Sequence, residues 1–414
     1  MGDIINMQDI KNGKIQSVEW VHMKTRKDGT TYPSKIWENL EQILKKHNIE
    51  IKYNLITKEM ECNIKTNKMR TLVTKIYTLN VKENLDMTKE EIIDSMHYIA
   101  EENAYNPFVD LMVENQNHNY GLINELFKCI YINDDNKENY DYYFTLFTKW
   151  CLNVVKMAHN TKRNKYRAAG ILVLQGEQGC RKTTFVESLM PISEWCNCDK
   201  SFYPDRTDSV IENTKYILVE WGELDDTLKS DQSKIKQFIT SAADEYRVPY
   251  GRFSEKYPRI TSFVGTVNSD GFLRDETGAR RFWIIPVLGF DFKKLEAIDK
   301  KELWGAVYSL WKSKKIKDYL EKDEMDKLNE VNRKYYLKND ISYIIDEKIK
   351  WDMPKEEWCV YGVTDIADYL MIKENKKIRT ELEKRGLKYA SHRTKNGNVK
   401  KGFKLPRFEV KLIY

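Results

Sequence analysis

The spacing of apolar residues changes twice along this chain, and the first stretch has the spacing of helices. Thr88 and Glu91 form a capping-box signature. The apolar residues that follow are spaced for one helix face: Ile92, Ile93, Met96 and Ile99. A second helix is predicted over 142–155, where large apolar residues again recur on one side. Residues 1–165 are therefore predicted to form a separate, mostly helical domain with some strand.

In the second stretch, short apolar runs alternate with amphipathic segments. The predicted strands are 169–174, 216–219, 260–267 and 282–287. A helix predicted over 301–311 closes the region. This alternation is typical of an α/β domain with a parallel sheet, and we place the domain at 166–312.

Charged residues dominate the third stretch. Residues 313–354 are predicted to form an exposed helical connector. Beyond it, helices are predicted over 364–370 and 376–385, and Asn396-Gly397 predicts a hairpin turn. Two helices followed by a β-hairpin indicate a small winged-helix-like domain over 355–414.

Composition and charge narrow the class of protein only slightly. The chain carries 69 Lys and Arg against 63 Asp and Glu, so the distribution of charge matters more than the net +6. Its seven cysteines lack a paired C-x-x-C spacing, which favours reduced thiols over disulfides or zinc. No signal-peptide pattern opens the chain, and no apolar run approaches the ~20 residues of a membrane span. We therefore expect a cytoplasmic protein without membrane contact.

A glycine-rich loop between the first predicted strand and a helix is the strongest chemical signal. It reads Gly176-Glu177-Gln178-Gly179-Cys180-Arg181-Lys182-Thr183, followed by Thr184. This matches the P-loop pattern, in which backbone N–H groups face phosphates, the lysine reaches the terminal phosphates and the hydroxyl ligates magnesium. Residues 176–184 are therefore predicted to bind ATP, with Lys182 in catalysis and Thr183 on Mg²⁺. An ordinary glycine turn would leave the Lys-Thr pair unexplained.

The match departs from the pattern at one position. Arg181 stands where the P-loop pattern has glycine. The backbone at 181 must therefore accept a side chain, and the loop is expected to differ there from the ordinary geometry.

Two carboxylates follow the next predicted strand. Glu220 and Glu223 lie at the carboxyl end of 216–219, where a parallel sheet places its chemistry. ATP hydrolysis needs one acidic group to order magnesium and another to orient water. We assign Glu220 to the metal and Glu223 to the water, with Asp225 and Asp226 as alternatives to either.

Polar residues also flank the last two predicted strands. Asn268 follows 260–267, where its amide can bind the γ-phosphate or the attacking water; a turn cap is the alternative. Arg280 and Arg281 precede 282–287, and a guanidinium there can stabilise the transferred phosphoryl group. Neighbouring side chains on an extended chain point in opposite directions. One arginine is therefore expected to act in a neighbouring subunit, and the other within its own subunit or in structure.

Two basic segments are candidate DNA-binding surfaces. The first combines cations with an aromatic ring that can stack on a base: Arg247, Tyr250, Arg252 and Lys256. Its alternative role is to brace an ATP interface. The second is C-terminal, where Glu409 is the single acid between 384 and 411, and its candidate residues are Lys376, Lys377, Arg379, Arg393, Lys395, Lys400 and Lys401. A solvated basic face is the alternative there.

The order of these motifs resembles the virulence-associated protein E family. The resemblance rests on the P-loop and four later segments: Val219–Leu224, Asp244–Arg252, Gly265–Asn268 and Thr277–Trp283. The family comprises ATPases of phages and mobile islands that are similar to superfamily 3 replicative helicases. The resemblance implies an AAA+ P-loop core that assembles as a hexamer, with ATP at subunit interfaces and single-stranded DNA in the ring pore. It also implies translocation from 3′ to 5′ and an accessory or collar role for 1–165.

From this resemblance we expect an ATP-driven DNA helicase and replication initiator. Duplex origin DNA at the C-terminal domain and host replication proteins are its candidate partners. The alternatives are a DNA-binding ATPase switch that melts or marks an origin without processive unwinding, and a nucleotide-regulated scaffold. A scaffold would need neither the acidic pair nor the adjacent arginines. The N-terminal region shows neither zinc-binding cysteines nor an acid cluster, so no primase activity is expected.

Overall fold

Two compact units make up the chain in the computed structural model. The first comprises Met1–Ser269 with Thr277–Val331, and the second comprises Asp270–Glu276 with Asn332–Tyr414. The structure describes residues 17–64, 69–134, 137–198, 200–230, 232–247, 254–269, 271–273, 279–336, 340–393 and 399–408.

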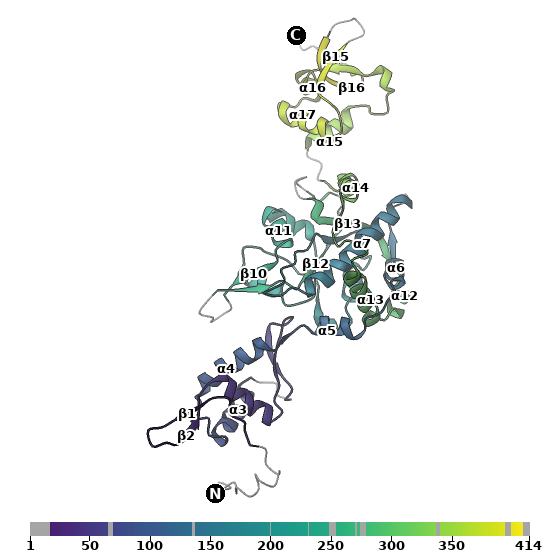
Figure 1. The fold of residues 1–414 in the computed structure, drawn as a ribbon. Coiled ribbons are helices and arrows are strands. Elements are labelled where there is room, and N and C mark those ends of the chain that lie inside the picture. The colour runs from purple at the N-terminus through teal and green to yellow at the C-terminus, as the bar shows by residue number, and fades with distance from the viewer. Residues whose placement is uncertain are drawn as a thin grey trace. The chain divides into compact units, whose positions relative to one another are not determined.

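The N-terminal part of the first unit combines short strands with helices around its own apolar core (Figure 1). Its strands are β1 (Met23–Thr25), β2 (Thr31–Pro33), β3 (Ile51–Asn54), β4 (Glu59–Cys62) and β5 (Ala104–Tyr105). β1 pairs with β2, and β3 lies between β4 and β5. Its helices are α2 (Trp37–Lys46), α3 (Met69–Lys82) and α4 (Lys89–Glu102). The helix predicted after Thr88 is confirmed as α4, and its capping box with Glu91 is present.

Three helices lead from this part to the central sheet: α5 (Pro107–Glu114), α6 (Gly121–Phe127) and α7 (Lys137–Ala158). The helix predicted over 142–155 is confirmed, although α7 extends beyond it at both ends. Trp150 in α7 is buried, and its indole N–H donates to the Phe263 carbonyl at 3.3 Å. This bond anchors α7 on the sheet.

The centre of the first unit is a six-stranded sheet in the order β6-β13-β7-β12-β9-β8. Its strands are β6 (Ile130–Ile132), β7 (Ile171–Gln175), β8 (Cys196–Asn197), β9 (Leu218–Trp221), β12 (Ser262–Val267) and β13 (Phe282–Phe290). All neighbouring pairs are parallel except β6 with β13. The α/β class is therefore confirmed. Because parallel strands share one direction, the carboxyl ends of β7, β9 and β12 meet at one edge.

The observed strands are shifted from the predicted ones for identifiable reasons. β9 starts two residues later than predicted, and the carbonyl of Tyr216 instead accepts the Thr261 hydroxyl at 2.6 Å. β13 continues to Phe290 because β6 pairs with its last residues. The alternation of apolar residues carries no information about such a partner strand.

The other elements of the first unit surround the sheet or extend from it. The helices are α8 (Lys182–Glu187), α9 (Thr207–Glu212), α10 (Leu224–Ser230), α11 (Gln232–Ile239), α12 (Phe292–Ala297), α13 (Lys300–Ser313) and α14 (Lys322–Asn332). The predicted closing helix 301–311 is confirmed as α13. β10 (Ala243–Tyr246) and β11 (Glu255–Pro258) form a separate antiparallel hairpin.

We expected the charged segment after α13 to be exposed, but part of it is packed against the core. Asp318 pairs with Lys156 at 3.0 Å, and Glu324 pairs with Lys149 at 2.6 Å. Leu328 is completely buried in the central core. The acids of this segment are therefore used to hold it against α7, which a count of charges does not reveal.

The second unit has its own apolar core, formed by helices and a small sheet. Its elements are α15 (Asp340–Lys348), β14 (Cys359–Tyr361), α16 (Val363–Leu370), α17 (Asn375–Lys384), β15 (Ala390–Arg393) and β16 (Val399–Leu405). The sheet order is β14-β16-β15, with both pairs antiparallel. The two helices predicted over 364–370 and 376–385 are confirmed as α16 and α17. The predicted turn at Asn396-Gly397 lies outside the described residues.

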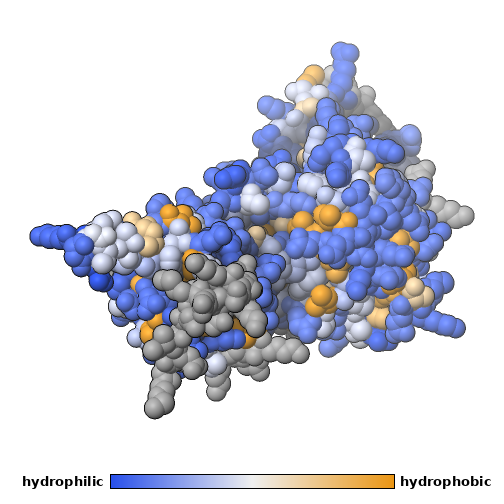
Figure 2. Space-filling view, turned by 60° about the horizontal axis from the view of Figure 1, so that its bottom comes forward, coloured by the Kyte–Doolittle hydropathy of each residue, from blue (hydrophilic) through white to orange (hydrophobic). Residues whose placement is uncertain are grey.

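No helix among the described residues is both long and apolar enough to cross a membrane. On the face shown in Figure 2, hydrophilic residues predominate and hydrophobic ones gather in small groups.

Candidate functional site

The loop between β7 and α8 lies at the carboxyl edge of the central sheet. Two glycines allow its path. A Cβ atom on Gly176 would lie 2.2 Å from the carbonyl oxygen of Val287, so the neighbouring strand leaves no room for a side chain. Gly179 has φ +88°, a conformation that residues with a side chain rarely adopt. The predicted nucleotide-binding residues 176–184 are this loop and the first turn of α8.

Arg181 is accommodated by a left-handed backbone with φ 66° and ψ 38°. This region favours glycine, the residue that the P-loop pattern has here. Its guanidinium carbon lies 3.8 Å from the centroid of the Phe292 ring, which indicates a cation–π contact. The side chain is thus held on an aromatic face while the backbone retains a glycine-like conformation.

Lys182 is buried, and neutral oxygen atoms hold its ammonium. The Nζ atom donates to the carbonyls of Gly176 and Glu177, at 2.8 and 2.9 Å, and to Oδ1 of Asn268 at 2.9 Å. Among the described residues, no carboxylate forms an ion pair with it. Its charge is therefore positioned but not neutralised.

Glu220 is completely buried at the end of β9 and accepts hydrogen bonds from two hydroxyls. Its Oε1 atom lies 2.9 Å from Thr183 Oγ1 and 2.7 Å from Thr266 Oγ1. The loop, the acidic strand and β12 are therefore linked through a single carboxylate oxygen.

A pocket of about 300 Å³ opens beside these groups. It is lined by Gln178, Gly179, Arg181, Lys182, Thr183, Gly222, Glu223, Thr266 and Asn268. Glu223 is exposed and has φ 52°, an unusual value for a residue with a side chain. The structure thus brings Lys182, Glu223 and Asn268 to one cavity, with Glu220 behind its wall.

Thr266 is a site residue that we did not identify from the sequence. Thr266 lies in β12, and Asn268 follows the end of this strand two residues later. Both line the same pocket, as expected if the period of two along the strand continues to Asn268. Once Asn268 is a candidate, this period of two is the signal that points to Thr266.

Arg280 and Arg281 do not lie on extended chain. They belong to a 3-10 turn, Ala279–Arg281, so our argument from opposite directions on a strand is wrong here. Neither lines the pocket. Burial, with Arg280 nearby, lowers the pKa of Arg281, and its Nε atom is buried without a hydrogen-bond partner among the described residues.

The first basic segment falls on the β10–β11 hairpin. Lys256 in β11 lies 3.4 Å from Glu245 across the hairpin, and both side chains are exposed. Arg247 is exposed and follows the last residue of β10. Tyr250 and Arg252 lie outside the described residues.

The C-terminal basic residues are opposed by more acids than the sequence suggested. Several pair with a carboxylate from outside the span 384–411: Lys377 with Glu374 at 2.8 Å, Arg379 with Glu383 at 2.9 Å, Lys400 with Asp365 at 2.8 Å and Arg385 with Asp346 at 2.8 Å. Our count of Glu409 as the sole opposing acid therefore misjudged this surface. Lys376 lies in α17, Arg393 in β15 and Lys401 in β16, all exposed. Lys395 lies outside the described residues.

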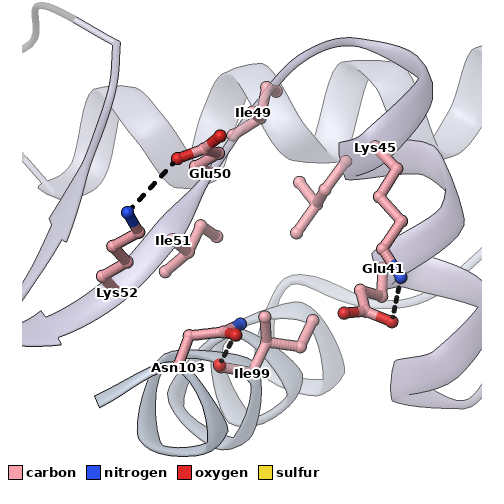
Figure 3. Close-up of a pocket in the computed structure, with 9 residues that line it drawn as sticks. Glu41, Lys45, Ile49, Glu50, Ile51, Lys52, Ile99 and Asn103 are labelled. Carbon is pink, nitrogen blue, oxygen red and sulfur yellow. Dashed lines mark hydrogen bonds and ion pairs between the residues drawn. The ribbon is translucent and has the colours of Figure 1, made fainter. Parts of the chain in front are cut away.

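A second pocket lies in the N-terminal part of the first unit (Figure 3). Its floor is apolar, with Ile49, Ile51 and Ile99. Its charged groups pair with one another: Lys45 with Glu41 at 2.8 Å and Lys52 with Glu50 at 3.5 Å. Each of the four charged side chains that line this pocket is at least partly exposed, so we do not assign chemistry to it.

Comparison with known proteins places the chain in a family. No curated protein sequence matches it. Two solved structures, described as the apo structure and the A-form apo structure of the NrS-1 C-terminal region, have 11% and 12% sequence identity and TM-scores of 0.47 and 0.46. Each comparison covers 90% of this chain and 99% of the other, but at these TM-scores the likeness supports no functional argument. The model of the virulence-associated protein E-like domain matches residues 119–337, more than half of the 414 residues. The chain therefore belongs to the virulence-associated protein E-like domain family.

Proposed function

We propose that this protein is an ATP-driven DNA helicase and replication initiator of a mobile element, with a superfamily 3-like AAA+ core. The observation that carries the proposal is the buried, un-neutralised ammonium of Lys182. A cation held by neutral oxygens retains its attraction for an anion, and glycine-rich backbone surrounds it. Triphosphate is the anion that suits a loop of this type.

The residues beside Lys182 suit the other requirements of ATP hydrolysis. The hydroxyl of Thr183 and the carboxylate of Glu220 offer adjacent hard oxygen ligands of the kind that Mg²⁺ prefers. When bound, Mg²⁺ would neutralise charge on the phosphate oxygens. Glu223, exposed in the pocket, would orient the attacking water, and Asn268 would bind the γ-phosphate while positioning Lys182. Asp225 remains an alternative to Glu223.

Hexamer formation and the use of an arginine in trans follow from the family resemblance. Neither Arg280 nor Arg281 lines the pocket of its own chain, which supports a role in a neighbouring site. Particle symmetry with an ATP analogue and single-stranded DNA tests this assembly. A hexamer with a strand in its pore supports the proposal, and a monomer under saturating ligand contradicts it.

Subunit mixing tests the arginines directly. We expect Arg280→Ala or Arg281→Ala subunits to regain activity when mixed with Lys182→Ala subunits, because each defective type supplies the part that the other lacks. Phosphate release is the measurement. No recovery, despite proven mixing, would favour a role within one subunit.

Two DNA contacts are proposed, on separate surfaces. The segment 247–256 would grip a single strand along which the protein moves from 3′ to 5′, and the winged-helix-like second unit would bind duplex origin DNA. Deleting residues from about 355 onward should then weaken duplex binding and its salt dependence but spare the ATPase stimulated by single strands. Arg252→Ala or Tyr250→Ala should do the reverse. Unchanged duplex affinity and salt slope after truncation would mean that the C-terminal cations form a solvated face.

An ATPase switch that melts or marks an origin is the second candidate function. Strand displacement on a forked duplex separates the two. A helicase unwinds beyond the origin with continued ATP turnover, whereas a switch stops after local melting.

A further inference from the structure

Lys58 places a positive charge between the N-terminal part of the first unit and the β10–β11 hairpin. Its Nζ atom donates to Thr214 Oγ1 and to the Tyr246 hydroxyl, each at 2.8 Å. The ammonium also lies 5.2 and 5.4 Å from the ring centroids of Tyr246 and Tyr257. Among the described residues, no carboxylate forms an ion pair with it. The charge is therefore held by hydroxyls and aromatic rings.

The turn that carries Lys58 is fixed at both ends. Asn54 is the last residue of β3. Its side-chain Oδ1 accepts a hydrogen bond from the backbone N–H of Ile56, and its backbone carbonyl accepts one from the N–H of Lys58, each at 2.8 Å. Ile56 is completely buried in the central core. Lys58 itself has φ 60°, a conformation that is unfavourable for lysine and that turns its side chain toward the hairpin. The turn 55–58 is therefore a rigid projection of the N-terminal part.

The hairpin meets this projection with one of its two faces. Tyr257 lies opposite Asp244 in the antiparallel register, and Tyr246 is two residues after Asp244 in β10, so Tyr246 and Tyr257 share that face. Their rings stack with centroids 4.5 Å apart. The opposite face carries the exposed Glu245–Lys256 pair. At the hairpin base, the buried Arg259 pairs with Asp244. The core thus fixes the base, while Lys58 contacts the strand next to the tip.

The surroundings of Lys58 disfavour the protonated form of its side chain. Burial lowers the pKa of the Lys58 ammonium to about 8; Asp244 opposes this effect, and Arg259 and Lys215 add to it. Its titratable contacts on the hairpin are the phenols Tyr246 and Tyr257, whose pKa values burial raises, so they stay neutral. Glu255 lies on the same face of the hairpin and accepts a hydrogen bond from the Tyr257 hydroxyl at 3.4 Å. A lysine released into solvent has a pKa near 10.4. The closed contact is therefore least favourable below pH 8 and strengthens as the pH rises through 8 toward 10.

We propose that Lys58 is a positioning residue that holds the β10–β11 hairpin against the turn 55–58, and that its ammonium makes this contact releasable. Its consequence for DNA rests on the proposed role of the hairpin in gripping a single strand. A releasable contact lets the hairpin move while its base stays anchored by Arg259.

Amide hydrogen exchange in β10 and β11 of the full chain tests the contact without reference to activity. We expect Lys58→Ala to exchange about tenfold faster at pH 7, because both hydrogen bonds and the packing of the stem are lost. In the wild type, protection corrected for intrinsic rates should rise about tenfold between pH 7 and 9. Lys58→Met keeps the stem without a titrating group, so its protection should not change over this range. Lys52→Met, on an exposed neighbour in β3, is the matched control and should behave as the wild type.

Wild-type protection that stays constant between pH 7 and 9, or Lys58→Ala strands as protected as those of the wild type, would overturn the inference. The functional consequence has a separate measurement, which is ATPase stimulation by single-stranded DNA. Lys58→Ala should reduce this stimulation while leaving basal turnover unchanged. If exchange responds as expected but the wild type shows no stimulation at all, the contact stands and the proposed function fails.

Discussion

The pocket at the sheet edge and the N-terminal pocket of Figure 3 both contain lysines, but the two sets of charges are used in opposite ways. In the pocket at the sheet edge, Lys182 is 7% exposed and bonds to two carbonyls and an amide from different parts of the chain. In the N-terminal pocket, the side chains of Lys45 and Lys52 are 61% and 51% exposed, and each pairs with a nearby carboxylate (Figure 3). The first charge is buried and has no carboxylate partner among the described residues, whereas the second set is solvated and already paired.

This difference indicates where function should be sought. A buried charge without a counter-ion is unfavourable for folding, so it marks a candidate ligand-binding site. An exposed pair contributes little to stability and carries little information about function. Substitutions in the two pockets test this difference. Their effects on ATP turnover and on the free energy of unfolding should be largest at the sheet edge and smallest in the N-terminal pocket.

The largest effect is expected from Lys182→Ala. It should lower ATP turnover about a hundredfold or more, because no other described cation is placed against the same loop carbonyls. Phosphate release under saturating ATP is the measurement. Wild-type turnover by this variant would remove the basis of the site assignment.

Glu223→Gln should separate binding from hydrolysis. We expect nucleotide affinity to remain and turnover to fall about a hundredfold, since the carboxylate that orients the attacking water is lost. Equilibrium binding of ATP and single-turnover hydrolysis should be measured together. Asp225→Asn is the control, because Asp225 is the alternative acid. If Asp225→Asn and not Glu223→Gln stops hydrolysis, the roles are exchanged.

Two glycines of the loop should differ in their effect on stability. Gly176→Ala should lower the free energy of unfolding by about 3 kcal/mol, because the new methyl group meets the fixed carbonyl of Val287. Gly179→Ala meets no atom within 4 Å and should cost only about 1 kcal/mol, from its left-handed backbone. Thermal unfolding of both variants tests the ranking. Equal losses would mean that the backbone relaxes around Gly176.

The smallest effects are expected in the N-terminal pocket. Lys45→Ala and Lys52→Ala should each change the free energy of unfolding by less than about 0.5 kcal/mol, since both pairs are exposed. Neither should alter ATP turnover. Chemical denaturation and the phosphate assay measure the two quantities. A turnover defect in either variant would show that this pocket is linked to the chemistry and would break the comparison.

Much of the candidate site is local in sequence and was therefore predictable. The loop 176–183, its strand and its helix are contiguous, so glycine spacing and the Lys-Thr pair suffice to locate them. Glu220 and Asn268 were found because each ends an apolar run, and parallel strands align such ends at one edge. The helix cap at Thr88 was likewise readable because it involves residues three apart.

The remaining features depend on contacts between distant parts of the chain. Three features of the site arise only when separate strands and helices meet. They are the complete burial of Glu220, its hydrogen bond from the Thr266 hydroxyl and the cation–π contact of Arg181 with Phe292. The same is true of Lys58, whose partners Thr214 and Tyr246 follow it by 156 and 188 positions. Residue types and periodicity determined which side chains could serve the chemistry. The tertiary structure decided which of them are desolvated and held together, because burial and hydrogen-bond partners depend on the packing of elements far apart in sequence.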